Sequence, residues 1–133
     1  NAKGAPKVTS LFKGAEVNPN GVYPLKDGML LLVGFVAPDK PRAIYAYGIS
    51  GQIRPLSDPI GRLDGLYEMR DGSILATDWN TGSLFYWNER DGKHPLAIGF
   101  KGPADFCVIP KGKSLLAYVP DLVQSHLRII ELQ

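Results

Sequence analysis

Three similar segments, spaced at nearly equal intervals, constrain the fold of this chain more than any other feature. Residues 20–28, 64–72 and 105–112 each run from an Asn or Asp through a short apolar stretch to a closing glycine. The intervals between these glycines are about 40–45 residues, which is the length of one four-stranded blade in a propeller array. A repeat of this period indicates successive copies of one supersecondary unit, each packed on its neighbours.

Within each copy, the sequence predicts an antiparallel meander. The pairs Asp27-Gly28 and Asp71-Gly72 supply residues that tolerate positive φ in a tight turn. A strand that is apolar along its whole length is buried on both faces, as the second strand of a blade is. We expect such strands at 29–33, 73–77 and 114–119. Third strands, rich in apolar residues, are expected at 43–47, 84–87 and 127–132, and more polar outer strands at 52–56 and 93–98.

The predicted fold class is all-β: a β-propeller of four-stranded antiparallel blades, with about three blades in this chain, half of a six-bladed ring. We place an outer strand at 7–12, complete blades at 20–61 and 62–101, and a three-stranded blade at 102–133. Three blades in an open arc leave two apolar faces in water. The expected partner is either a second copy or the missing blades of a longer propeller. In a two-fold dimer, each N-terminal strand would complete the other chain's last blade.

The composition narrows the classes of partner and compartment. The formal net charge is +2 and the fifteen Lys and Arg residues are scattered, which does not suit nucleic acid. The longest apolar run, at 29–33, is too short to cross a bilayer, so we expect no membrane partner. The single cysteine, Cys107, excludes an internal disulfide and is expected to be a small buried hydrophobe. The chain begins at Asn1 without an initiator Met, and we favour a periplasmic or secreted protein over a cytoplasmic one.

The segment 62–79, which continues through 81–85, resembles a blade of the gluconolactonase and senescence-marker-protein superfamily. Such a blade runs from Asn-Gly or Asp-Gly, through a turn Asp-Gly, to a strand that ends in Thr-Asp with a glycine after it. The segment 102–106 resembles the start of the next blade in bacterial members. The resemblance covers about residues 20–133 and is shared in large part with NHL-repeat and other six-bladed propellers.

The resemblance implies a divalent cation, calcium or another, held at the channel mouth by carboxylate and amide oxygens. Asn20 and Asp64 match the ligand pattern, and Asp105 stands at the equivalent place, although Phe106 follows it where the pattern has glycine. No residue matches the Glu ligand of those enzymes; Glu16 is close to Asn20 but carries no motif. The resemblance therefore implies a lactonase-like site in which one ligand is missing from this chain.

The residues themselves point to the same place. Asn20, Asp64 and Asp105 begin the innermost strands of successive blades, so their side chains are expected to converge at one end of the channel. Oxygen ligands of this kind suit hard cations such as calcium. The alternative is that these side chains only form Asx turns at the start of each strand. The sequence has no Gly-rich phosphate loop, so we expect no nucleotide cofactor.

Other candidate residues receive structural interpretations. The segment 78–83 begins like a calcium loop, but its glycine comes one place early and no Glu follows at the twelfth position, which favours a blade turn. His94 and His126 are expected at strand edges. Four aromatic residues are expected in the blade core: Trp79, Phe85, Tyr86 and Trp87. Three arginines are expected on the solvated rim: Arg42, Arg62 and Arg70.

Two functions from different classes follow. The first, which we favour, is a module that binds a small ligand, a metal or a protein at the channel mouth and on the face that carries the loops 35–41 and 120–125. The alternative is a divalent-metal-dependent lactone or ester hydrolase of gluconolactonase type, in which the cation polarises the carbonyl and activates a water. No residue is assigned as a catalytic acid or base.

Overall fold

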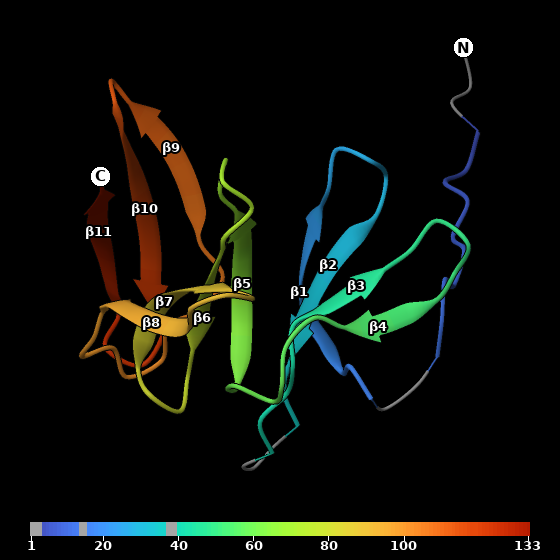
Figure 1. Ribbon diagram of the computed structural model, residues 1–133, viewed down its shortest axis with the longest axis horizontal. Helices are drawn as coiled ribbons and strands as arrows, with labels where there is room; N and C mark the ends of the chain where they lie inside the picture. Colours follow the sequence, from blue (N-terminus) through green and yellow to red (C-terminus); the bar gives the residue numbers. More distant parts are fainter. Residues whose placement is uncertain (1–3, 14–15, 37–39) are drawn as a thin grey trace.

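The computed structural model describes residues 4–13, 16–36 and 40–133, and these residues form strands, turns and extended segments. The strands make three separate antiparallel sheets of four, four and three strands. The sheets follow one another across the molecule in chain order, from β1–β4 on the right of Figure 1 to β9–β11 on the left. In the described part of the chain no helix has the length and apolarity needed to cross a membrane. The all-β prediction is confirmed.

Each sheet is a meander in which consecutive strands pair with one another, and we name the three sheets blades 1, 2 and 3. Blade 1 contains β1 (Pro19–Pro24), β2 (Leu30–Gly34), β3 (Tyr45–Tyr47) and β4 (Ile53–Pro55). Blade 2 contains β5 (Leu63–Glu68), β6 (Ile74–Asp78), β7 (Ser83–Asn88) and β8 (Gly92–Ala97). Blade 3 contains β9 (Cys107–Lys111), β10 (Ser114–Asp121) and β11 (His126–Leu132).

The tight turns between the first two strands of a blade have the geometry that the Asp-Gly pairs predict. Gly28 and Gly72 have φ of +85° and +82°, values that residues with a Cβ rarely adopt. The Asp27 carboxylate accepts a hydrogen bond from the Met29 amide at 3.0 Å, and the Asp71 carboxylate accepts one from Ser73 at 3.0 Å. These Asx contacts fix the start of the second strand, whose apolar residues then enter the core.

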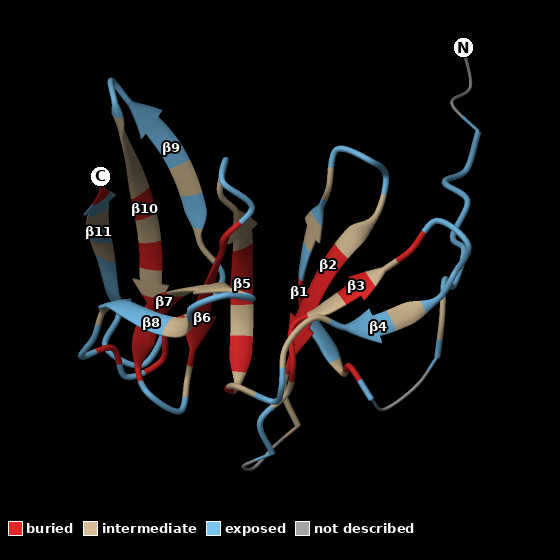
Figure 2. Cartoon of the chain, in the orientation of Figure 1, coloured by how far each residue is buried: buried red, intermediate tan, exposed pale blue. Residues whose placement is uncertain are grey.

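The hydrophobic core lies between neighbouring blades. Leu31 and Val33 of blade 1 pack against Leu66 and Ala76 of blade 2, and the other face of blade 2 packs against blade 3 through Leu75. In Figure 2 the buried segments are concentrated on β2, β5, β6 and β10, in the region where the sheets face one another. Blade 2 is therefore covered on both faces, whereas blades 1 and 3 each have a neighbour on one face.

Two buried aspartates tie the start of a blade to the end of its second strand. Asp78 accepts hydrogen bonds from the amides of Arg62 and Asn80, each at 2.9 Å, and from the ammonium of Lys93 at 2.6 Å. Asp121, one blade later, accepts bonds from the amides of Lys101 and Gly102 at 2.8 and 3.0 Å. The oxygens of Asp78 are thus occupied by the protein, as the blade-turn interpretation of 78–83 expects.

Two expectations from the sequence differ from the structure. Residues 7–12 form no strand; they are extended, and Phe12 packs on Tyr47 with 5.7 Å between ring centroids. A strand forms only where a sheet edge offers backbone partners, and residues 7–12 pair with none of the described sheets. Cys107 is exposed, not buried, because the innermost strand β9 is covered by a neighbouring blade on one side only.

Candidate functional site

The innermost strands of blades 1 and 2 carry a bulge at the two positions expected to bind a ligand. In β1, Pro19 pairs with Gly34 and Gly21 with Val33, so that Asn20 is left without a partner in the ladder. In β5, the register shifts in the same way between Leu63 and Leu66, at Asp64 and Gly65. A bulge leaves an extra residue unpaired and redirects its side chain. Asn20 and Asp64 therefore occupy equivalent positions.

The side chains of Asn20 and Asp64 meet. Asn20 donates a side-chain hydrogen bond to the half-buried Asp64 carboxylate, and Trp79 Nε1 donates another at 3.1 Å. Burial raises the pKa of Asp64 above its ordinary value, and the nearby negative charge of Asp105 adds to this, against the lowering effect of the two hydrogen bonds. The site is thus an oriented, partly buried carboxylate that lies near a second negative charge.

The glycines that follow the two ligand candidates allow neighbouring blades to approach closely. A Cβ on Gly21 would lie 1.9 Å from the Asp64 carbonyl oxygen, and a Cβ on Gly65 would lie 2.7 Å from a carboxylate oxygen of Asp105. Only glycine permits these distances. The Asn-Gly and Asp-Gly pairs of the repeat therefore bring the starts of successive innermost strands together.

Asp105 does not stand at the position equivalent to Asp64, which corrects the sequence-based alignment. The bridge between Pro103 and Asp121 matches the pairing of Leu63 with Asp78, so that Ala104 is the equivalent of Asp64. The steps from Ala104 to Gly112 and from Asp64 to Gly72 are equal in length, so matching Asp105 to Asp64 began the third repeat one residue late. The Asp105 carboxylate accepts a hydrogen bond from the Phe106 amide at 2.9 Å, an Asx-type contact, while its charge still acts on Asp64.

An arginine and two aromatic rings also lie near Asp64, and two of these three residues, Arg62 and Trp79, were expected elsewhere. The Arg62 guanidinium lies 4.9 Å from the ring centroid of Phe35, and that ring lies 6.3 Å from Trp79. Arg62 Nε is buried and has no hydrogen-bond partner among the described residues. Arg62 was expected on the solvated rim, but its Nε is buried. Trp79 was expected in the blade core, but its indole N–H bonds Asp64 at the site. The available signal in the sequence was that Arg62, directly before β5, lies two residues from Asp64, a spacing that places both side chains on one face of an extended chain.

The oxygen donors available to a cation at this mouth are the Asn20 amide and the carboxylates of Asp64 and Asp105. Among the described residues, no group of three or more His, Cys, Asp and Glu side chains is placed to hold a metal. Glu16 is exposed, and its backbone carbonyl accepts a bond from the Tyr45 hydroxyl at 3.3 Å. His94 stacks on Tyr86 and bonds the Asp91 carbonyl, as a turn histidine does. Of the loop 35–41, residues 37–39 lie outside the described residues.

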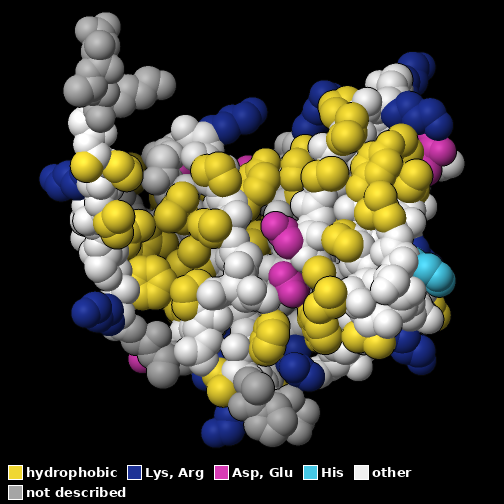
Figure 3. All heavy atoms as spheres, turned by 180° about the vertical axis from the view of Figure 1, so that it is seen from behind, with side chains coloured by type: hydrophobic (Ala, Val, Ile, Leu, Met, Phe, Trp, Pro, Cys, Tyr) yellow, Lys and Arg dark blue, Asp and Glu magenta, His cyan; other side chains and the backbone are white. Residues whose placement is uncertain are grey.

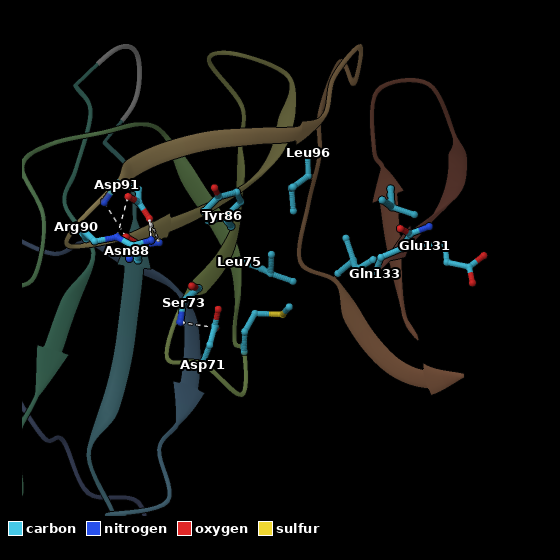
Figure 4. Close-up of a pocket in the computed structure, with 13 residues that line it drawn as sticks. Asp71, Ser73, Leu75, Tyr86, Asn88, Arg90, Asp91, Leu96, Glu131 and Gln133 are labelled. Carbon is cyan, nitrogen blue, oxygen red and sulfur yellow. Dashed lines mark hydrogen bonds and ion pairs between the residues drawn. The ribbon is translucent and has the colours of Figure 1, made fainter. Parts of the chain in front are cut away.

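A cavity of about 430 Å³ lies at the opposite end of the seam between blades 2 and 3. Figure 4 shows Asp71 and Ser73 on one side and Glu131 and Gln133 on the other, with Leu75 and Tyr86 between them. The polar groups of Asn88, Arg90 and Asp91 are hydrogen-bonded to one another. Two other carboxylates of this cavity also have partners, since Asp71 accepts a hydrogen bond from the Ser73 amide and a Glu131 oxygen lies 3.9 Å from Lys111 Nζ.

Comparison with solved structures identifies the architecture. The chain superposes on a candidate gluconolactonase with a TM-score of 0.57 and 18% identity, over 91% of this chain and 49% of that one. It superposes on virginiamycin B lyase from Staphylococcus aureus with a TM-score of 0.56 and 16% identity, over 88% of this chain and 42% of that one.

The fold is that of a β-propeller. The chain spans about half the length of these two proteins, as three blades of a larger ring would. At this identity the comparison establishes the fold. The fold agrees with the resemblance to gluconolactonase-like propellers. No family model matches the sequence, and no curated protein matches it.

Proposed function

We propose that this chain is a propeller module that binds a divalent cation, and through it a small oxygen-bearing ligand, at the channel mouth. The observation that carries the proposal is the half-buried carboxylate of Asp64, which is oriented by Asn20 and Trp79 and lies near the charge of Asp105. A purely structural Asx residue would bond its own strand, as Asp27 does with Met29.

Electrostatics favour a cation over a neutral ligand at this position. Burial and the proximity of Asp105 both oppose ionisation of Asp64, and the charge of a bound cation would offset both effects. Calcium takes six to eight oxygen ligands, so about half of its coordination would come from water, from the ligand or from the rest of the ring. A cation with part of its coordination left to water could exchange that water for an oxygen of a small ligand.

Calorimetric titration with Ca²⁺, Mn²⁺ and Zn²⁺ tests the proposal directly. Replacing Asp64 by Asn should weaken binding at least tenfold, a loss of about 1.4 kcal/mol or more, because the charged ligand is removed while the shape is kept. The matched control is Asp58→Asn, since Asp58 is exposed and no described contact uses its carboxylate. Absence of binding at millimolar cation, or equal binding by both variants, would show that the cluster only forms turns.

Hydrolysis of a lactone or ester is the second candidate, and Arg62 is the residue that favours it. Its guanidinium lies over the Phe35 ring close to Trp79, so a carbonyl or anionic oxygen could be held between the aromatic wall and the carboxylates. A bound divalent cation would polarise the carbonyl and acidify a water. Solved propellers similar to this chain include a candidate gluconolactonase.

Turnover separates the two functions. A hydrolase should open a simple aldonolactone only with the cation present, and Arg62→Met should raise KM while leaving cation affinity within about twofold. A binding module should hold the cation with no turnover above the rate of the Asp64→Asn variant. The second result is the one that we expect, because the described residues include no second titratable group hydrogen-bonded to the cluster that could serve as a general base.

A further inference from the structure

The two ends of the blade array expose apolar residues at positions that are buried in the middle of the array. The repeat register makes Val22 of blade 1 the equivalent of Leu66 of blade 2, because their partners Leu32 and Ala76 are equivalent. Leu66 is 4% exposed against blade 1, whereas Val22 is 61% exposed. The front face of blade 1 therefore has the residues of a blade-to-blade contact without the neighbouring blade.

The back face of blade 3 is exposed in the same way. Leu84 and Leu127 are equivalent, since each pairs with the residue immediately before a buried aspartate, Asp78 or Asp121. Leu84 is fully buried, whereas Leu127 is 64% exposed and Ile129, two residues along the same strand, is 59% exposed. Figure 3 shows hydrophobic side chains gathered towards both ends of the long axis of the molecule, with acidic side chains between them.

We propose that the occupant of both faces is a second copy of this chain, with the front of blade 1 packed on the back of the partner's blade 3. The contact would repeat the one between blades 1 and 2 and the one between blades 2 and 3, which the chain already makes twice. A contact between unlike faces closes when the rotation it imposes completes a circle. Two three-bladed copies related by a two-fold axis form a closed ring with two such contacts.

A free sheet edge supports the same arrangement. Strand β11 of blade 3 pairs with β10 on one side only, and its other edge has no strand beside it in the described structure. The segment 7–12 is extended and unpaired, and its apolar residues Val8 and Leu11 are exposed. In the ring, this segment lies next to the partner's β11 and can add to it as the fourth strand of that blade, which removes an edge prone to aggregation.

The ring would also complete the mouth described above. Each copy contributes Asn20 and Asp64 from the starts of its innermost strands, so a closed ring places two sets around one channel. This arrangement does not require that the mouth binds a cation, and a failure of cation binding would leave it intact.

Light scattering coupled to size exclusion, from micromolar to submillimolar chain, tests the proposal. We expect a single species of twice the 14.5 kDa chain mass. Val22→Glu and Leu127→Glu should each convert it to monomer, while circular dichroism shows that the strands are retained, because both side chains are exposed in the single chain. The control is Ile49→Glu, which changes an equally exposed apolar residue whose blade 2 equivalent, Glu89, is also exposed.

Mixing the two disrupted variants distinguishes the pairing of unlike faces from other associations. A mixed pair retains one contact with both wild-type faces, so dimer should reappear on mixing. A monomer at every concentration overturns the proposal and assigns the two faces to blades elsewhere in a longer chain. Loss of the dimer through Leu127→Glu alone, with no effect of Val22→Glu, overturns it in favour of back-to-back pairing, and open-ended oligomers overturn the two-fold closure.

Discussion

Blades 2 and 3 are built from the same repeat, yet they differ in how many faces are covered and in the partners of their buried aspartates. Blade 2 is covered on both faces, and its buried Asp78 meets the cation of Lys93 as well as backbone amides. Blade 3 is covered on one face, and the contacts of its Asp121 are backbone amides alone. The comparison shows that the residues of one repeat are enough to form a blade. The neighbouring blades determine how many of its apolar side chains are buried.

The largest change in the free energy of unfolding is expected when the buried Asp78 is replaced. Asp78→Ala should lower the free energy of unfolding by about 3 kcal/mol or more, because Lys93, whose side chain is 22% exposed, loses the partner 2.6 Å away. Lys93→Met should cost less, since the amides of Arg62 and Asn80 still bond Asp78. Urea unfolding measures both values. A Lys93→Met variant as stable as the wild type would mean that the ion pair adds nothing to the amide contacts.

The equivalent leucines of the two blades provide the next test. Leu84→Ala should cost about 2–5 kcal/mol because it opens a cavity between blades 2 and 3. In the monomer, Leu127→Ala should cost less than about 0.5 kcal/mol, since the side chain is exposed. Unfolding at low concentration in a Val22→Glu background keeps the chain monomeric. Comparable losses at both positions would show that blade 3 is covered within a single chain.

The pH dependence of stability should separate Asp121 from exposed carboxylates. Burial tends to raise its pKa, but bonds from the amides of Lys101, Gln124, Gly102 and Val123 outweigh this, so that the folded pKa lies below the ordinary value. A lowered folded pKa gives stability that is complete above the unfolded pKa of about 3.9 and is lost as the pH falls through the folded value. Asp121→Asn should flatten this acid limb of a plot of unfolding free energy against pH. An acid limb with the wild-type slope in Asp121→Asn would contradict the assignment.

The smallest change in the free energy of unfolding is expected at Asp64, where removing the charge should not destabilise the protein. Burial raises the folded pKa of Asp64, so its ionised form opposes folding at neutral pH. Asp64→Asn should therefore leave the unfolding free energy unchanged or slightly higher at pH 7, and the difference should vanish as the pH falls below about 3.9. Thermal unfolding without divalent cations measures this. A clear loss of stability would indicate that the Asp64 carboxylate is structural.

Much of the fold could be predicted because the signals are local. The Asp-Gly turns require positive φ at glycine, and the wholly apolar strands can only lie between two neighbours. The segment 7–12 had the composition of an outer strand, but strand formation depends on a partner edge that composition does not supply.

The candidate site was only half predictable. Asn20 and Asp64 meet because the Asn-Gly and Asp-Gly pairs set equivalent bulges, a feature with a local cause. The place of Asp105 depended on the strand register of blade 3, and matching aspartate to aspartate in the sequence shifted that register by one residue. Trp79, directly after β6, reaches Asp64 on the adjacent strand β5, a contact that no spacing in the sequence reveals.

By itself, the sequence determined that this chain forms blades and that there are three of them, because turn chemistry and burial on both strand faces act over a few residues. Only the tertiary structure decided which carboxylate is oriented for binding, which arginine and aromatic rings surround it, and which apolar residues stay exposed. Those outcomes depend on the packing of one blade against the next, where bulges, registers and missing neighbours act together.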